Sequence, residues 1–121
     1  MTENQKSKKY DLEERTQRFA KNVRNFVKKL PKNLANNEDG KQLIRSSGSV
    51  GANYIEANEA LSKKDFIFRV KISRKEAKES RYWLDLIDTT AIIKLEDERQ
   101  KLSAEATELM NIFGAIIKKS E

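Results

Sequence analysis

Residues Ser62–Ile87 read SKKDFIFRVKISRKEAKESRYWLDLI. Ser62 and Asp65 have the spacing of a capping box, in which a hydroxyl and a carboxylate satisfy the free N–H groups at the start of a helix. Small and apolar residues then recur at alternating steps of four and three: Phe66, Val70, Ser73, Ala77, Ser80, Leu84 and Ile87. Such a heptad row predicts a long helix that crosses its neighbours at a shallow angle, as helices do in bundles.

Two further helices are predicted by the same kind of spacing. The first runs from about Asp11 to Lys29, and Pro31 ends it because a proline pushes the preceding residue out of the helical region. Its buried face is Leu12, Phe19, Val23, Phe26 and Leu30. Lys32–Asp39 is then expected to form a loop. The last helix follows a turn at Thr89–Lys94 and starts near Glu96, with the buried face Leu102, Ala106, Leu109, Phe113 and Ile116.

The segment from about Gly40 to Ala60 contains many small residues. Its stretch Ser46–Gly51 has the composition of a flexible linker. Against that interpretation, Ile44, Gly48, Gly51 and Ile55 keep helical spacing, and each glycine costs only about 1 kcal/mol in a helix. We therefore predict a continuous helix whose small side chains let another helix backbone approach closely.

Together these patterns predict an all-α fold, an up-down-up-down antiparallel four-helix bundle over residues 10–121, after a flexible basic tail at residues 1–9. The chain has 37% apolar and 36% charged residues, which suits narrow buried stripes and wide solvated faces. One proline and four glycines are too few for the turns of a sheet protein. The beginning of the chain lacks the apolar stretch of a secretory signal, and no apolar run is long enough to span a membrane, so we expect a cytoplasmic protein without membrane contact.

The chain has neither histidine nor cysteine. It therefore lacks the usual general acid or base near neutral pH and the readiest nucleophile. Glu76 and Glu79 have the spacing of a di-iron Glu-x-x-His pair but not its histidine. We expect no catalytic residues, no metal and no cofactor. A metal-dependent nuclease built from Glu56, Glu76 and Glu79 is the weaker alternative.

The net charge of +6 is unevenly distributed. Residues 1–33 and 62–90 carry the basic excess, and the tail adds Lys6, Lys8 and Lys9. A helical wheel places the other candidates opposite the buried faces of the first and third helices: Arg18, Lys21, Arg24, Lys28, Lys64, Lys71, Lys75 and Lys78. These faces either keep the protein soluble or bind the phosphates of RNA or DNA in a salt-dependent way.

The third helix carries a second apolar row about 130° from its heptad row. The row contains Phe68, Ile72, Trp83 and Leu86, with Tyr82 beside it. Such a surface is typical of an interface, although a central helix flanked on two sides within one chain is the alternative. We expect self-association through this row and the small-residue side of the second helix, Gly48, Gly51 and Ala52. Glu79 lies within the row, and a buried carboxylate needs a partner. We expect a buried ion pair between Glu79 and Arg45, with Arg69 as the other candidate partner.

Two segments resemble a known family. Arg45–Ala57, RSSGSVGANYIEA, resembles the second-helix signature of the four-helix-bundle proteins encoded in 23S rRNA intervening sequences. Asp65-Phe66 and Lys75–Leu84, KEAKESRYWL, are similar to the same family's third-helix signature. The resemblance spans about residues 19–117, and it departs at Ala57, where many members have glycine.

The resemblance implies a bacterial four-helix bundle that assembles into a ring-like homopentamer. A relative, the accessory variability protein of diversity-generating retroelements, is a basic barrel that engages nucleic acid and a reverse transcriptase, so a nucleic-acid enzyme is an implied partner. The family name records where some of the genes lie, and no catalytic residue can be transferred. The expected function is that of a non-enzymatic oligomeric accessory protein that binds nucleic-acid phosphates. The alternative is a protein-only oligomeric adaptor.

Overall fold

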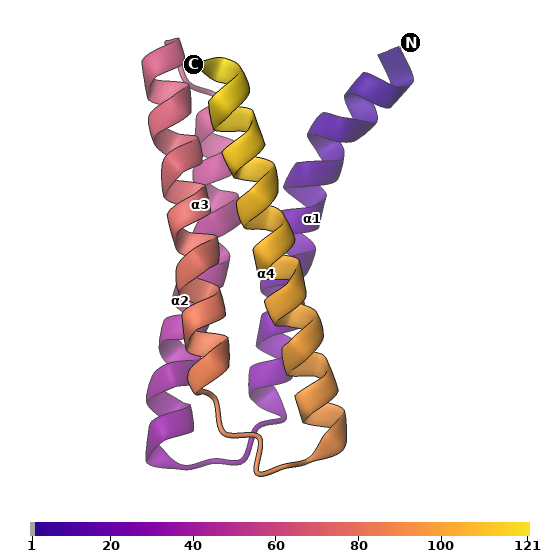
Figure 1. Cartoon of the computed structure of the whole chain (residues 1–121), viewed down its shortest axis with the longest axis vertical. Helices are drawn as coiled ribbons and strands as arrows, with labels where there is room; N and C mark the ends of the chain where they lie inside the picture. The colour runs from indigo at the N-terminus through magenta and orange to yellow at the C-terminus, as the bar shows by residue number, and fades with distance from the viewer. Residues whose placement is uncertain (1) are drawn as a thin grey trace.

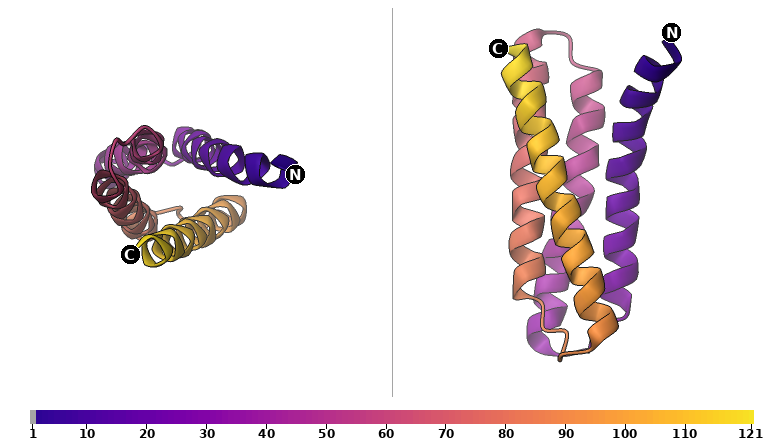
Figure 2. Two further views of the ribbon diagram at one scale, coloured as in Figure 1. Left: turned by 90° about the horizontal axis from the view of Figure 1, so that it is seen from above. Right: turned by 45° about the vertical axis from the view of Figure 1, so that its right-hand side comes forward.

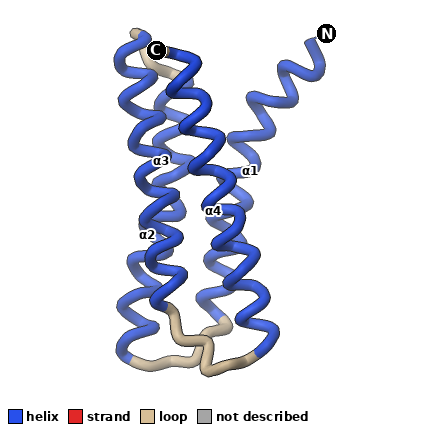
Figure 3. Tube along the Cα trace, in the orientation of Figure 1, coloured by secondary structure: helices blue, strands red, loops and turns tan. Residues whose placement is uncertain are grey.

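The structure is a computed structural model that describes the backbone of residues 2–121 and the side chains of residues 12–121. Its helices are α1 (Thr2–Lys28), α2 (Leu34–Asn58), α3 (Lys63–Leu86) and α4 (Ile93–Ser120). They run up and down in turn, so both termini lie at the same end of the molecule (Figure 1). No strand occurs between residues 2 and 121, and loops make up only the connections (Figure 3). The predicted all-α four-helix bundle is confirmed.

The helices follow one another around the bundle (Figure 2). In the described part of the chain, α2 packs against α1 and α3, and α4 packs against α3 and α1. α1 and α3 therefore lie diagonally across the core, with no pair of their Cα atoms within 8 Å in the described part of the chain. The predicted buried faces of α1, α3 and α4 are confirmed, with two differences. Phe66 is only partly buried, and in α4 Ile117 rather than Ile116 is the buried residue of the last turn.

Three helices begin earlier than predicted. α4 starts at Ile93, within the expected turn Thr89–Lys94. α1 starts at Thr2 rather than near Asp11, and its first turns lean away from the other helices (Figure 1). The tail boundary at residue 9 stays a prediction, and the side chains of Lys6, Lys8 and Lys9 lie outside the described ones. α2 starts at Leu34, so the expected loop Lys32–Asp39 is too long. The reason is Asn33, whose side chain accepts a hydrogen bond from the Asn36 N–H as an N-cap.

α2 is continuous through its glycines, so the linker alternative for Ser46–Gly51 is wrong. The small side chains give the helix close contacts with its neighbours. Ser46 and Ser80 meet across α2 and α3 with their hydroxyl oxygens 2.9 Å apart. Ser73 donates to the Val50 carbonyl at 2.9 Å. These hydroxyls are buried, and the hydrogen bonds offset the cost of removing them from water.

Half of the predicted capping box of α3 is confirmed, because the Ser62 side chain accepts a hydrogen bond from the Asp65 N–H at 3.1 Å. The other half, a hydrogen bond to the Asp65 carboxylate, does not occur among the described residues. At the opposite end of the bundle, a buried asparagine joins the two loops. Asn36 donates to the carbonyls of Pro31 and Asp88 at 3.0 and 2.8 Å, and accepts from the Asp88 N–H at 3.0 Å. The α1–α2 connection is thereby tied to the α3–α4 connection.

Candidate functional site

The four cationic side chains predicted on α1 are all exposed: Arg18, Lys21, Arg24 and Lys28. None of them forms an ion pair with an acid of the described part of the chain. Arg24 donates to the Ala20 carbonyl, and its Nη2 lies 3.4 Å from where a Cβ at Gly48 would be. The outer face of α1 is thus a row of solvated cations beside α2.

The four predicted cations of α3 are exposed as well: Lys64, Lys71, Lys75 and Lys78. They also lack ion pairs with described acids. Because α1 and α3 are diagonal, their outer faces point to opposite sides of the bundle (Figure 2). The structure therefore does not bring the two predicted basic faces together within one chain.

The second apolar row of α3 is partly uncovered. Phe68 is 58%, Tyr82 57% and Leu86 47% exposed. Ile72 and Trp83 are half-buried, and Trp83 also packs against the core. α3 is flanked by α2 and α4, as the alternative required, yet this flanking leaves three large side chains in solvent. Tyr82 and Leu86 lie one helical turn apart, and neighbouring exposed apolar side chains of this kind are typical of an interface.

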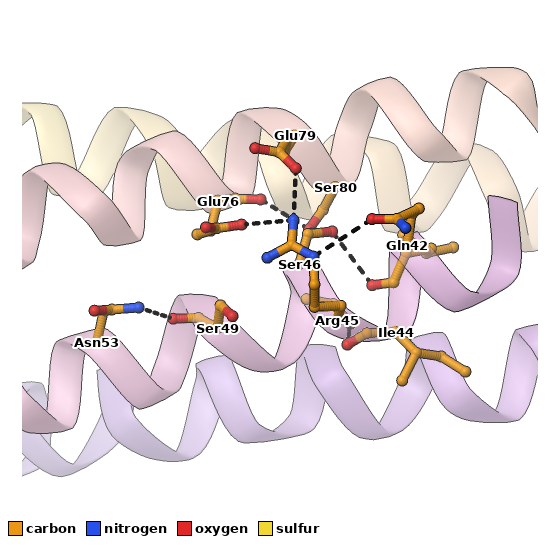
Figure 4. A network of polar contacts seen from close by, with 11 residues as sticks. Gln42, Ile44, Arg45, Ser46, Ser49, Asn53, Glu76, Glu79 and Ser80 are labelled. Carbon is orange, nitrogen blue, oxygen red and sulfur yellow. Dashed lines mark hydrogen bonds and ion pairs between the residues drawn. The ribbon is translucent and has the colours of Figure 1, made fainter. Parts of the chain in front are cut away.

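Arg45 and Glu79 form the predicted ion pair, with Arg45 Nη2 donating to a Glu79 carboxylate oxygen at 2.6 Å (Figure 4). The expected burial of the pair is wrong, because the two side chains are 48% and 35% exposed. The more buried acid is Glu76, which is 12% exposed and lies 3.4 Å from the same nitrogen. Arg69, the other candidate partner, donates to the Asn53 side chain instead.

The small residues of α2 mostly face α1 of the same chain. Gly51 is buried against Thr16, so the prediction that it is open to a neighbouring copy is wrong for this residue. Ala52 is exposed, and Gly48 is half-buried beneath Arg24. These residues line an open groove of about 380 Å³ between α1 and α2, and Ile55 lines it as well. The remaining access to the small-residue side is through this groove.

Several polar groups outside these surfaces stabilise the bundle. Arg15 joins α1 to α4 through Glu105 and Glu108, and its hydrogen bond with Glu105 is the main reason that its pKa is raised. Hydrogen bonds from Arg99 and Thr89 lower the pKa of Glu96. These groups hold helices and turns together and do not converge on a cleft.

The described side chains contain no group of three or more acids arranged to hold a metal ion. The nuclease alternative built on Glu56, Glu76 and Glu79 therefore lacks geometric support. Glu76 instead neutralises Arg45 together with Glu79. The sequence spacing indicated this ion pairing in one way: Glu76 and Glu79 are three residues apart, so both can face α2. Asn36 gave no comparable signal, because its partner Asp88 is distant in the chain.

Comparison with known proteins identifies a family and a related solved structure. The profile of the family described as "23S rRNA-intervening sequence protein" matches residues 8–115. A crystal structure from Bacteroides thetaiotaomicron VPI-5482, of a protein with unknown function from the S23 ribosomal protein family, is 32% identical in sequence. The match covers 88% of this chain and 97% of that one, with a TM-score of 0.74. No curated protein matches the chain.

Proposed function

The chain belongs to the family of 23S rRNA-intervening sequence proteins, and from this premise we propose that it is a non-enzymatic, self-associating accessory protein that binds the phosphates of RNA or DNA. The family is of unknown function and is not known to be enzymatic. The proposal therefore depends on the surfaces of this chain.

The observation that carries the proposal is the outer face of α3. Phe68, Tyr82 and Leu86 are exposed there beside a row of unpaired lysines. Burying apolar surface contributes about 25 cal/mol per Å². A second copy that covers these side chains would therefore form a complex stabilised by their burial. The ring-like homopentamer implied by the family resemblance is the assembly we propose, since a contact between two different surfaces closes into a ring.

The proposed ligand is a polyanion. The sequence has 25 Lys and Arg against 19 Asp and Glu, and exposed cations without ion pairs lie on both α1 and α3. A repeated assembly multiplies these charges, so even weak phosphate contacts add up along one strand. A nucleic-acid enzyme acting on that strand is the proposed further partner, and the proposed location is the cytoplasm. None of the helices in the described residues is apolar over enough length to cross a bilayer.

The test combines light scattering with retention on heparin across a salt gradient. An oligomer that is strongly retained and elutes only at high salt concentration supports the proposal. Phosphate contacts release counterions, so added salt weakens them. A monomer at high micromolar concentration contradicts the self-association. An oligomer with weak retention favours the second candidate, a protein-only adaptor, which the exposed apolar side chains of α3 also support.

A further inference from the structure

We infer that the outer face of α1, formed by Arg18, Lys21, Arg24 and Lys28, is the surface that contacts the phosphates, and that the lysines of α3 instead border a protein contact. This assignment rests on the proposed function and divides its two activities between two sides of the bundle. The ligand is the sugar–phosphate backbone of a single RNA or DNA strand.

The first argument is the placement of the helices. α1 and α3 are diagonal, so their outer faces point in opposite directions across the core (Figure 2). One strand that lies along the outer face of α1 therefore cannot also lie along the outer face of α3 of the same chain. A choice between the two faces follows from the fold alone.

The second argument is what surrounds the cations. The side chains described on α1, from Leu12 onward, include no exposed large apolar residue. On α3, by contrast, the lysines alternate around the helix with Phe68, Tyr82 and Leu86, all about half exposed. A face that mixes aromatic and aliphatic side chains with lysine is typical of a protein interface with a charged rim. The outer face of α1 carries polar side chains, Gln17 and Asn25, and one exposed acid, Glu14, beside its cations. Cations and side-chain amides are the groups that contact the backbone of nucleic acid.

The third argument is the freedom of the α1 cations. Arg15 and Lys29 on the α4 side of the same helix are tied to Glu105 and Glu98. The row from Arg18 to Lys28, like the lysines of α3, has no ion pair with a described acid, so a phosphate that binds there displaces no carboxylate. The row covers about 15 Å of helix at 1.5 Å per residue.

The row continues beyond the end of α1. Lys28, Lys32 and Lys41 line one groove where α1 turns into α2. Lys41 lies 3.4 Å from Glu38, an exposed pair that contributes little and can exchange its partner. The cationic path thus extends from the middle of α1 to the loop end of the bundle.

The test compares two double charge reversals of equal size. Lys21→Glu with Lys28→Glu changes α1, and Lys71→Glu with Lys78→Glu changes α3 by the same net charge. Binding of a fluorescent single-stranded RNA, and of DNA of the same sequence, is measured by anisotropy over a range of salt. We expect the α1 variant to lose at least about tenfold in affinity for both, with a salt slope smaller by about 1.4, since two contacts are lost at about 0.7 each. The α3 variant should stay within about twofold of the wild type.

The outcomes separate this inference from the proposed function. Equal losses in the two variants, or a larger loss in the α3 variant, overturn the assignment to α1 and leave nucleic-acid binding intact. Failure of the wild type to bind either strand overturns the proposed nucleic-acid function, and the assignment with it. Arg18→Gln with Lys21→Gln serves as a second α1 variant that introduces no new acid, and circular dichroism checks that each variant is folded.

Discussion

A Cβ atom added at Gly51 would lie 2.8 Å from the Thr16 hydroxyl oxygen and 3.1 Å from the Thr16 Cβ. Neither distance is compatible with ordinary van der Waals contact, and the second involves an atom fixed to the α1 backbone. Gly51 does not have a positive φ, so the glycine is required for space and not for its conformational freedom. α1 and α2 approach each other closely because this position has no side chain.

Replacing Gly51 with alanine should destabilise the protein by about 1–3 kcal/mol, because α1 must move away from α2 to admit the methyl group. Leucine should cost more. The control is Gly114→Ala in α4, where no atom lies within 4 Å of the added Cβ. That variant should gain up to about 1 kcal/mol from helix propensity. Urea unfolding of both variants tests this, and a gain in stability at both positions would contradict the close contact.

The sequence predicted a continuous, closely packed α2 but not which helix it approaches. The spacing of Gly48 and Gly51 places both on one side of α2, and any neighbour satisfies that pattern. We had expected a second copy to occupy this side, whereas Thr16 of the same chain covers Gly51. Helical periodicity gives the direction of a face within its own helix, and only the packing of the bundle decides what lies opposite.

The loop clamp of Asn36 gives a second prediction. Asn36→Ala should cost about 1–3 kcal/mol, because the Asp88 N–H and the Pro31 carbonyl lose their buried partner. Asn36→Asp keeps the acceptor for the Asp88 N–H but places a carboxylate against two carbonyls, so it should rescue nothing at neutral pH. Thermal unfolding measures both, and full stability of the alanine variant would show that solvent replaces the clamp.

The Arg45 ion pairs give a third prediction. Arg45→Met should destabilise the protein by about 1–2 kcal/mol, because it leaves Glu76 buried without a cation. The loss is no larger because about half of the arginine side chain is solvated. Glu76→Gln in the same chain should restore much of the loss. A double-mutant cycle in urea gives the coupling energy. No rescue by the glutamine would mean that packing of the arginine stem, and not its charge, stabilises the helix pair.

The sequence also predicted the exposure of the candidate cations residue by residue, but not how their faces are arranged. The exposure of the cations on α1 and α3 follows from the helical wheel of each helix. The two faces point apart because of the order of the helices around the core. The pattern of one helix carries no information about that order. Asn36 could not be predicted for a related reason, because its contact with Asp88 exists only once two loops meet at one end of the bundle.

Glu96 gives a prediction for pH. Hydrogen bonds from Arg99 and Thr89 lower its pKa below the usual 4.5. The unfolded chain therefore takes up this proton at a higher pH than the folded protein does, so the contribution of Glu96 to stability is present above about pH 4.5 and is lost as the pH falls through the folded value. Both Glu96→Gln and Arg99→Met should flatten the acid limb of a stability–pH profile. An unchanged acid limb in both variants would contradict the assignment.

The last prediction concerns self-association through the outer face of α3. Trp83→Ala is a poor test, because Trp83 also packs against the core and its loss would weaken the fold itself. Phe68→Ser with Leu86→Gln removes side chains that are about half exposed, so the isolated chain should keep its stability. The matched control is Leu34→Ser with Ile93→Gln, which removes two exposed apolar side chains that lie outside this face.

We expect the α3 variant to raise the dissociation constant of the assembly at least about tenfold, equivalent to about 1.4 kcal/mol. The control variant should assemble as the wild type does, although its two side chains are more exposed than Phe68 and Leu86. Light scattering over a range of concentrations measures both. Equal effects of the two pairs would mean that association follows general surface hydrophobicity. Because the two pairs differ in position and hardly in chemistry, a loss confined to the α3 variant would place the contact on that face.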